Sequence, residues 1–331
     1  MSKPVKWGVL STAKIGREQV IPAIGAAEGA SLHAIASRSP QRASTCAAQF
    51  GATVSYGTYE DILTDPDVEA VYIPLPTSHH AAWSIKALEA GKHVLCEKPI
   101  ALHADEIGAI KKARESSGCL ASEAFMVTYH PQWHKVRDLL AQGAIGRLRH
   151  VHGVFSFFTR DETNTRNIVA MGGGALPDIG VYPTVTTRFA TGKEPQRVRA
   201  RVERDATFGT DIFTTAEMDF GDFSLSMMVS TQLALRQEMV FHGETGFISL
   251  SAPFNAGLYD ADVVTLRNQD HSGEQRFRFS GVNQYQLQIE AFSRAVRGSK
   301  EAIFSLEAST LNQRAIDAIY RAGESGGWEQ V

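Results

Sequence analysis

The chain has 331 residues, which is longer than one typical domain, and 43% of them are hydrophobic, which is enough for two cores. We therefore expect two domains. Its net charge of −3 at pH 7 argues against a polynucleotide partner, because nucleic-acid binding needs Lys and Arg clustered on one face. The sequence has no apolar run long enough to span a bilayer and no signal-like segment, so we expect a cytoplasmic protein without membrane contact. Its three cysteines, Cys46, Cys96 and Cys119, have no CxxC spacing, so we expect neither a disulfide framework nor a metal site.

Short apolar strands and helical patterns alternate over residues 1–123. We expect strands at 6–10, 32–37, 70–73, 93–96 and 120–123, and helices at 15–27, 41–50, 59–63, 81–90 and 104–117. Strands that alternate with helices of this length form βαβ units around a parallel sheet. The sequence therefore predicts an α/β, Rossmann-type doubly wound domain over residues 1–123.

The turn after the first strand can be compared with the dinucleotide-binding pattern G-x-G-x-x-G. Ser11 and Ala13 stand at the first two glycine positions, and Gly16 keeps the third. Small side chains still let the backbone approach a pyrophosphate, and the N-terminal amides of the next helix would face the phosphates. An ordinary tight strand-to-helix turn is the alternative. The candidate cofactor contacts here are Ser11, Thr12, Ala13, Lys14 and Ile15.

The end of the second strand bears on the choice of cofactor. Ser37 and Arg38 lie there, Arg42 follows one helical turn later, and no carboxylate is present to bind the ribose hydroxyls of NAD. Hydroxyl and guanidinium groups suit a 2′-phosphate, so these three residues favour NADP over NAD. A solvated arginine in a loop is the alternative.

Two prolines stiffen the turn after the third strand, where a cofactor ring or ribose could rest. The adjacent His79 and His80 are more typical of a helix cap or of exposed positions than of an acid–base pair. The candidate cofactor contacts in this segment are Pro74, Leu75, Pro76, Thr77 and His79.

Residues 91–99 read Gly-Lys-His-Val-Leu-Cys-Glu-Lys-Pro and end a buried strand in a charged pair. The carboxyl ends of strands in an open parallel sheet form the ligand crevice, so Glu97 and Lys98 are expected to point at a bound ligand. Pro99 biases Lys98 towards an extended backbone, and the bond between them is one where a cis peptide is tolerated.

Residues 87–99 (Ala-Leu-Glu-Ala-Gly-Lys-His-Val-Leu-Cys-Glu-Lys-Pro) resemble the signature of the Gfo/Idh/MocA oxidoreductases, the family of glucose–fructose oxidoreductase and inositol dehydrogenase. The substituted glycine loop resembles the sugar-dehydrogenase and dihydrodiol-dehydrogenase branch, and the resemblance covers nearly the whole chain. It implies that Glu123, Met126 and His130 line the nicotinamide and substrate site, with Met126 contacting the cofactor. A hinge packed for stability is the alternative.

Residues 124–331 are expected to form an α+β substrate-binding and dimerisation domain with a large, mostly antiparallel open sheet. The family commonly dimerises through this sheet, so the resemblance implies a homodimer. Leu225, Met227 and Val229 could face the second subunit, and a core within one chain is the alternative. Strands are expected at 147–158, 197–204, 212–220, 223–231, 238–243, 247–251, 263–267 and 275–279, and helices at 132–142, 284–297 and 306–322.

The resemblance also points to substrate contacts in this second domain. The polar loop 159–167 corresponds to a region with which the family recognises sugar hydroxyls, and Arg166 is the candidate contact there, to substrate and cofactor. Asp178 and Tyr182 resemble the family's second motif, and in a helical turn they would share one face. Gly180 would leave room for a ligand between them.

Oxidation of an alcohol requires removal of a hydroxyl proton in addition to the hydride transfer that the cofactor supports. A free tyrosine has a pKa of about 10, and a neighbouring ammonium group lowers it. We therefore expect Tyr182 to act as general acid/base, Lys98 to bind the substrate hydroxyl and lower the tyrosine pKa, and Asp178 to bind another hydroxyl.

The expected activity is NADP-dependent oxidation of a carbohydrate, first of all an aldose at its anomeric carbon to a lactone. Alternatives within the enzyme class are reduction of a keto-sugar such as 1,5-anhydrofructose, oxidation of a trans-dihydrodiol, and sugar–sugar oxidoreduction with retained NADP. The alternative from another class is a catalytically inactive sugar or dinucleotide sensor, which would have no chemical reason to keep Lys98, Asp178 and Tyr182.

Overall fold

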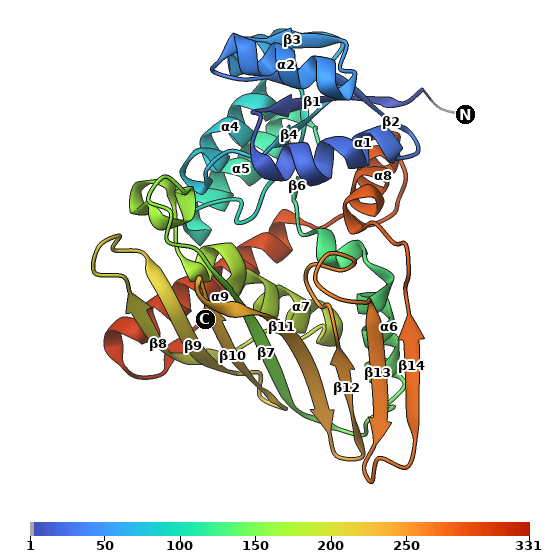
Figure 1. The fold of residues 1–331 in the computed structure, drawn as a ribbon, viewed down its shortest axis with the longest axis vertical. Helices are drawn as coiled ribbons and strands as arrows, with labels where there is room; N and C mark the ends of the chain where they lie inside the picture. Colours follow the sequence, from blue (N-terminus) through green and yellow to red (C-terminus); the bar gives the residue numbers. More distant parts are fainter. Residues whose placement is uncertain (1–2) are drawn as a thin grey trace. The chain divides into compact units, whose positions relative to one another are not determined.

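The computed structural model describes residues 3–331 (Figure 1). By its internal contacts the chain divides into two compact units. The first consists of Met1–Met126 and Asn283–Thr310, and the second of Val127–Val282 and Leu311–Val331. The domain boundary expected after residue 123 stays a prediction.

Within residues 3–331, the first unit contains a six-stranded sheet with the strand order β3-β2-β1-β4-β5-β6. All of its pairings are parallel, so the predicted doubly wound sheet is confirmed. The order reverses between β1 and β4, and ligands of open α/β sheets bind at such a point. The strands are β1 (Val5–Leu10), β2 (Ala30–Ala36), β3 (Val54–Tyr56), β4 (Ala70–Ile73), β5 (His93–Cys96) and β6 (Ala121–Glu123).

The helices of the first unit follow from capping signals as well as from apolar periodicity. The helix α2, for example, begins where Ser39 accepts a hydrogen bond from the Arg42 N–H and where Pro40 takes the first helical position, and it ends at Gly51 with a φ of 72°. The helical segments are a π-helical turn η1 (Gly16–Val20), α1 (Ile21–Ala26), α2 (Pro40–Phe50), α3 (Tyr59–Thr64), α4 (Thr77–Glu89), α5 (Ala104–Ser117) and α8 (Gln284–Val296).

The helix α8 packs on the first unit, although the sequence prediction placed it in the second domain. The indole N–H of Trp7 in β1 donates to the Ser293 hydroxyl at 3.1 Å, and the Trp7 ring lies 5.4 Å from that of Phe292. Gln286 also donates to the Ala26 carbonyl group at the end of α1. Late residues therefore complete the core beside the first strand.

The second unit contains, within the described chain, a nine-stranded sheet with the order β14-β13-β12-β11-β7-β10-β9-β8-β15. The strands β7 and β10 pair in parallel and the other neighbours pair antiparallel, which confirms the mostly antiparallel sheet. The strands are β7 (Leu148–Phe158), β8 (Arg197–Arg204), β9 (Asp211–Asp219), β10 (Ser224–Ser230), β11 (Gln232–Gly243), β12 (Gly246–Leu250), β13 (Val263–Asn268), β14 (Glu274–Arg278) and β15 (Glu329–Gln330).

The apolar face of β10 belongs to the core of this unit. Leu225, Met227 and Val229 are at most 3% exposed, and the hydroxyl group of Thr184 in α7 lies 3.8 Å from the Met227 sulfur. The hypothesis that these three residues face another subunit is therefore wrong, because helical segments of the same chain cover them. The helical segments whose bounds have not yet been given are η2 (Met126–Tyr129), α6 (Pro131–Ala141), η3 (Thr165–Asn167), η4 (Val169–Met171), η5 (Leu176–Gly180), α7 (Val181–Thr191) and α9 (Leu306–Ser325).

Cys46 and Cys96 are buried free thiols, and Cys119 is partly exposed. Among the described residues, no helix combines the length and the apolar character that crossing a membrane requires.

Candidate active site

The loop after β1 meets the turn after β4 at the point where the strand order reverses. The Ser11 hydroxyl group donates to the Pro74 carbonyl oxygen at 3.3 Å and accepts from the Ala13 N–H at 3.2 Å. Ser11 has a φ of 125°, a conformation that favours glycine, and it stands where the dinucleotide pattern has its first glycine. The serine thus adopts the glycine-like turn and ties the two candidate cofactor segments together.

The remaining residues of this loop are partly or fully exposed. Thr12, Ala13 and Ile15 are half-buried, and Lys14 is exposed and lies 3.9 Å from the Glu18 carboxylate. The Thr12 carbonyl oxygen accepts from the Arg17 side chain at 3.0 Å.

Arg38 and Arg42 are both exposed just beyond the carboxyl end of β2, whereas Ser37 is buried and bonded locally. The Ser37 hydroxyl group accepts from the Ser39 N–H at 3.2 Å and so shapes the turn into α2. Burial raises the pKa of Tyr59, while the charge and hydrogen bond of the neighbouring Arg38 act to lower it. Two exposed arginines thus stand at this strand end, and Arg38 also hydrogen-bonds to Tyr59.

The charged pair of the 91–99 segment lies at the carboxyl end of β5. The Tyr72 hydroxyl group donates to Glu97 Oε1 at 2.7 Å, and the Lys98 N–H donates to Glu97 Oε2 at 3.3 Å. The Lys98–Pro99 peptide bond is cis. Lys98 itself is partly exposed. It follows the end of β5, as the sequence predicted.

A second carboxyl group lies below this segment. Glu123 at the end of β6 is 3% exposed, and its Oε1 accepts from the Ile100 N–H at 3.0 Å. Burial raises the pKa of Glu123 to about 7, with a further upward effect from the Glu97 charge, while Ser309, the Ile100 N–H and Lys98 act to lower it. Glu123 therefore supports the backbone just after Lys98.

His130 and Met126 lie inside the protein. His130 is fully buried, and its Nδ1 accepts from the Gln132 N–H at 3.1 Å, so it caps α6. Met126 is 3% exposed at the start of η2. The contacts of His130 are those expected of a hinge residue packed for stability, which was the alternative to a residue that lines the site.

In the second unit, Arg166 and Asp178 form an ion pair in which Arg166 Nε donates to Asp178 Oδ2 at 2.6 Å. The approach depends on Gly173, because a Cβ atom there would lie 2.5 Å from the carbonyl oxygens of Thr165 and Arg166. Arg166 also lies over the Phe157 ring at 5.8 Å. The two candidate substrate contacts thus form one charged group.

Tyr182 lies four residues after Asp178, in the first turn of α7, and is 5% exposed. Its ring lies 5.7 Å from that of Phe155 and 5.5 Å from that of Phe254. The prediction that Gly180 leaves room for a ligand is wrong, since a Cβ atom there would lie 2.5 Å from Leu176 Cδ1. Gly180 instead allows close packing beneath the motif.

Two family models match the chain. Residues 5–125 match the oxidoreductase family with an NAD-binding Rossmann fold, and residues 133–249 match the GFO/IDH/MocA C-terminal domain. The chain belongs to the Gfo/Idh/MocA oxidoreductase family. The resemblance inferred from residues 87–99 is thereby confirmed.

Individual relatives extend the match over almost the whole Gfo/Idh/MocA chain. It is 42% identical over 331 residues to an uncharacterised oxidoreductase of Rhizobium meliloti, with 99% of each chain covered. It is 33% identical to a D-xylose 1-dehydrogenase (NADP(+)) of Haloferax volcanii, with 97% of this chain and 98% of the relative covered. A 3-ketoreductase from Actinomadura kijaniata, crystallised with NADP and TDP-benzene, matches with a TM-score of 0.90 and 30% identity over 97% of this chain and 98% of the other.

Sequence reasoning missed two buried polar residues of this Gfo/Idh/MocA protein that support the candidate site. His80 in α4 is 1% exposed, with both ring nitrogens near backbone carbonyl oxygens, so it is neither an exposed residue nor a cap. Asp211 in β9 accepts from the Leu176 N–H at 2.6 Å and from the Tyr320 hydroxyl at 2.6 Å. A signal for Asp211 existed, because this acidic residue stands directly before the apolar residues Ile212 and Phe213 at the start of a strand.

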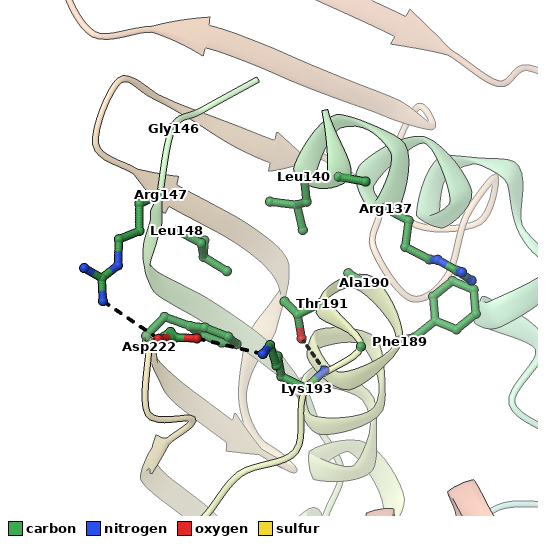
Figure 2. A pocket seen from close by; sticks show the side chains of 13 residues that line it. Arg137, Leu140, Gly146, Arg147, Leu148, Phe189, Ala190, Thr191, Lys193 and Asp222 are labelled. Carbon is green, nitrogen blue, oxygen red and sulfur yellow. Dashed lines mark hydrogen bonds and ion pairs between the residues drawn. The ribbon is translucent and has the colours of Figure 1, made fainter. Parts of the chain in front are cut away.

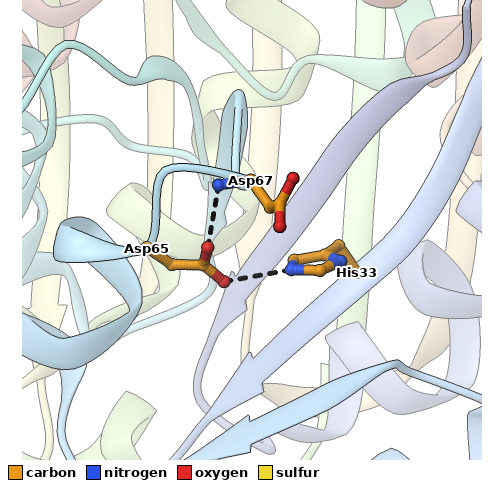
Figure 3. A group of neighbouring side chains, drawn as sticks. All are labelled: His33, Asp65 and Asp67. Atoms are coloured by element: carbon orange, nitrogen blue, oxygen red, sulfur yellow. Dashed lines mark hydrogen bonds and ion pairs between the residues drawn. The ribbon is translucent and has the colours of Figure 1, made fainter.

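A cluster outside the candidate site has the residue types of a metal site: His33, Asp65 and Asp67 (Figure 3). His33 Nε2 lies 3.0 Å from Asp65 Oδ2, which also accepts from the Tyr56 hydroxyl, and Asp67 pairs with Lys6 at 2.5 Å. Burial acts to raise the Asp65 pKa, but hydrogen bonds from Asp67, Tyr56 and His33 outweigh it and lower the pKa. These partners account for the cluster as a structural ion-pair network.

The second unit also has a pocket of about 700 Å³ at the ends of α6 and α7 (Figure 2). Asp222 lies 3.8 Å from Arg147 and 3.9 Å from Lys193, and Arg137 lies over the Phe189 ring at 5.1 Å. All of its charged side chains are ones that the sequence analysis did not single out. No predicted site residue lines it.

Proposed function

We propose that this protein is an NADP-dependent oxidoreductase that oxidises an aldose at its anomeric carbon to a lactone. The observation that carries the proposal is the position of Lys98 at the carboxyl end of β5, in a backbone held by Glu97 and Glu123. The D-xylose 1-dehydrogenase (NADP(+)) among the relatives supports the choice of an aldose and of NADP.

The residues of the first unit suit NADP. The loop at residues 11–15 and the turn at residues 74–77 would hold the dinucleotide at the switch point of the sheet. Arg38 and Arg42, with the start of α2 beside them, provide guanidinium and backbone N–H donors for a 2′-phosphate. When bound, the nicotinamide would accept hydride from the substrate carbon or return it in the reverse direction.

The chain's own residues handle the proton and the orientation of the sugar. Lys98 donates a hydrogen bond to the reacting hydroxyl, and its ammonium stabilises the phenolate of Tyr182, which takes the hydroxyl proton. Asp178, which pairs with Arg166, accepts from a second hydroxyl, and Arg166 donates to a neighbouring oxygen. Arg166 in this scheme thus contacts the substrate directly and also holds Asp178 through their ion pair.

Variants of the Actinomadura kijaniata ketoreductase support the roles of Lys98 and Tyr182. One solved variant has a tyrosine replaced by phenylalanine, and another has a lysine replaced by alanine. The two replaced positions in that protein are separated by as many residues as Lys98 and Tyr182 are in this chain.

A second candidate function is reduction of a keto-sugar. The chain is 32% identical to a dTDP-3,4-didehydro-2,6-dideoxy-α-D-glucose 3-reductase over 96% of its length. The same Lys98 and Tyr182 would then bind a carbonyl oxygen and donate the proton to it. Homodimer formation and a cytoplasmic location stay predictions from the sequence.

The test is turnover of purified protein with NADP and a panel of aldoses that begins with D-xylose, followed as NADPH absorbance. We expect NADPH to accumulate, and Lys98→Met to abolish turnover while NADPH binding, followed by its fluorescence, is kept. Consumption of NADPH with a keto-sugar and no oxidation of any aldose would favour the second candidate. Wild-type turnover in Lys98→Met would remove Lys98 from the chemistry.

A further inference from the structure

His80 lies between two segments of the proposed cofactor and substrate site. It belongs to the first turn of α4 and is 1% exposed. Its Nδ1 lies 2.7 Å from the carbonyl oxygen of Pro99, the residue after Lys98, and its Nε2 lies 2.7 Å from the carbonyl oxygen of Leu75. One buried ring thus contacts both the turn at residues 74–77 and the segment that carries Lys98.

The number of protons on the ring decides how many of these contacts are hydrogen bonds. Both neighbours are carbonyl oxygens, which only accept, and a neutral imidazole carries one N–H group. Burial lowers the pKa of His80 to about 4, and the charges of Lys98 and His79 act in the same direction, against the two carbonyl contacts. At neutral pH the ring is therefore neutral and donates to one carbonyl oxygen.

The surroundings favour donation to Pro99. The contact between Nδ1 and Pro99 is buried, and a buried carbonyl group that loses its donor has no water to replace the hydrogen bond. The contact with Leu75 is partly exposed, so water can hydrogen-bond to that carbonyl group instead. The favoured tautomer has its proton on Nδ1.

This bond completes a set of contacts around the Lys98 backbone. Glu97 before it is held by the Tyr72 hydroxyl group, and Ile100 after it donates to Glu123. Between these two contacts, His80 adds one at the Pro99 carbonyl oxygen. The direction in which the Lys98 side chain leaves the backbone depends on all three anchors.

We propose that His80 is a positioning residue for Lys98, which it orients through an Nδ1–H hydrogen bond to the Pro99 carbonyl oxygen. The proposal rests on the role given to Lys98 under the proposed function. A lysine displaced by a fraction of an ångström would bind the substrate hydroxyl less well in the transition state, so the effect of His80 falls on kcat.

Asparagine and glutamine separate the two contacts. The amide nitrogen of Asn occupies roughly the place of Nδ1 and can donate to Pro99, whereas that of Gln reaches roughly the place of Nε2 and can donate only to Leu75. We expect His80→Gln and His80→Leu to lower kcat by about tenfold or more, with little change in the Kd for NADPH. His80→Asn is expected to restore most of the turnover.

Turnover is measured with the panel sugar that reacts fastest and NADP, beside Lys98→Met. The matched controls are His242→Asn and His242→Gln, which change an exposed histidine of β11. These two control variants should have the same turnover. Equal losses in His80→Asn and His80→Gln, together with equal losses of thermal stability, would show a merely structural role and overturn the inference. If Lys98→Met keeps turnover, it is the proposed function that fails.

A second readout needs no substrate. Trace labelling with acetic anhydride, followed by mass spectrometry, measures the reactivity of Lys98 against that of exposed Lys86 in the same sample. We expect the relative labelling of Lys98 to change in His80→Gln and to stay at the wild-type value in His80→Asn. Identical labelling in both variants would overturn the inference even if no sugar in the panel reacts.

Discussion

At the residue scale, the choice between NADP and NAD depends on two exposed arginines at one strand end. Arg38 and Arg42 lie beyond β2, where a carboxylate would repel a 2′-phosphate and bind the ribose hydroxyls of NAD. Arg38 also forms a side-chain hydrogen bond with Tyr59. The planar guanidinium groups of both arginines match the geometry of a phosphate group.

We predict that Arg38→Ala weakens binding of NADP by about 1.5–3 kcal/mol, because a charge-assisted hydrogen bond is lost, and leaves binding of NAD almost unchanged. Titration calorimetry with both dinucleotides measures this. Lys112→Ala, which removes one positive charge from an exposed position of α5, is the matched control for net charge and should alter neither. Equal weakening of NADP and NAD would contradict the 2′-phosphate assignment.

The residue types of the candidate site could be predicted, but not their pairing. Lys98, Asp178 and Tyr182 belong to short sequence motifs that can be recognised without a structure. The ion pair between Arg166 and Asp178 could not be foreseen, because it depends on how a glycine-rich loop turns back on residues 165–166. Likewise, nothing in the adjacent pair His79 and His80 shows that one is exposed and the other fully enclosed.

At the element scale, the start of the helical run that carries Asp178 and Tyr182 is anchored by one buried carboxylate. Asp211 in β9 accepts from the N–H of Leu176, the first residue of η5, and from the hydroxyl group of Tyr320 in α9. Burial raises the pKa of Asp211, against the hydrogen bonds from Tyr320 and Leu176. The three elements are thereby fixed to one another at a single side chain.

We predict that Asp211→Leu destabilises the protein by about 1–3 kcal/mol, because two buried donors lose their acceptor. Asp219→Asn, in the same strand but at a partly exposed position, should cost less than about 1 kcal/mol. Thermal unfolding followed by circular dichroism compares them. A melting temperature of Asp211→Leu equal to that of Asp219→Asn would show that Asp211 does not anchor the motif.

The short buried strands β4 and β5 and the longer strand β8 were predicted with their observed bounds, whereas β3 and α7 were not predicted. Arg197–Arg204 was predicted with its bounds as observed, since half-buried strands alternate along the chain. The edge strand β3 has three residues, all partly exposed, which is too short to show alternation. The helix α7 was not predicted, because nine of its eleven residues are buried and it therefore lacks a polar stripe.

At the scale of the whole molecule, hydrophobic periodicity cannot predict which of the two units a segment late in the chain belongs to. The segment 284–297 was correctly predicted as a helix, but its apolar face carries no information about which sheet it covers. Only long-range contacts such as that of Trp7 with Ser293 place α8 on the parallel sheet. The chain thus returns to its first unit, and the stability of that unit depends on residues more than two hundred positions apart.

The stability of the whole molecule should depend on pH through buried groups with opposite signs. Burial lowers the pKa of His80 to about 4, with Lys98 and His79 adding to it, and lowers that of His130 to about 4, with His134 adding to it. The unfolded chain, with histidine pKa values of about 6.5, binds more protons between these limits. The stability that the neutral rings contribute is therefore lost as the pH falls from about 6.5 to about 4.

Glu123 acts in the opposite direction. Its pKa of about 7 exceeds that of an unfolded glutamate, so the folded state binds more protons between about 4.5 and 7, and ionisation above that range costs up to about 3 kcal/mol. Glu123→Gln keeps an acceptor for the Ile100 N–H and removes the ionisation. We predict that this variant is more stable than wild type at pH 8 and that the difference vanishes towards pH 4.5.

Urea unfolding midpoints at pH 4.5, 6 and 8 measure the two effects together. The wild type should lose stability on the acid side less steeply than Glu123→Gln, because only in the wild type does protonation of a buried carboxyl group offset the charging of the histidines. Parallel pH profiles for the two proteins would mean that Glu123 is ionised in the folded state throughout. In that case the segment after Lys98 would be supported by a charged carboxylate, and the ammonium of Lys98 would have Glu123 as well as Glu97 to balance it.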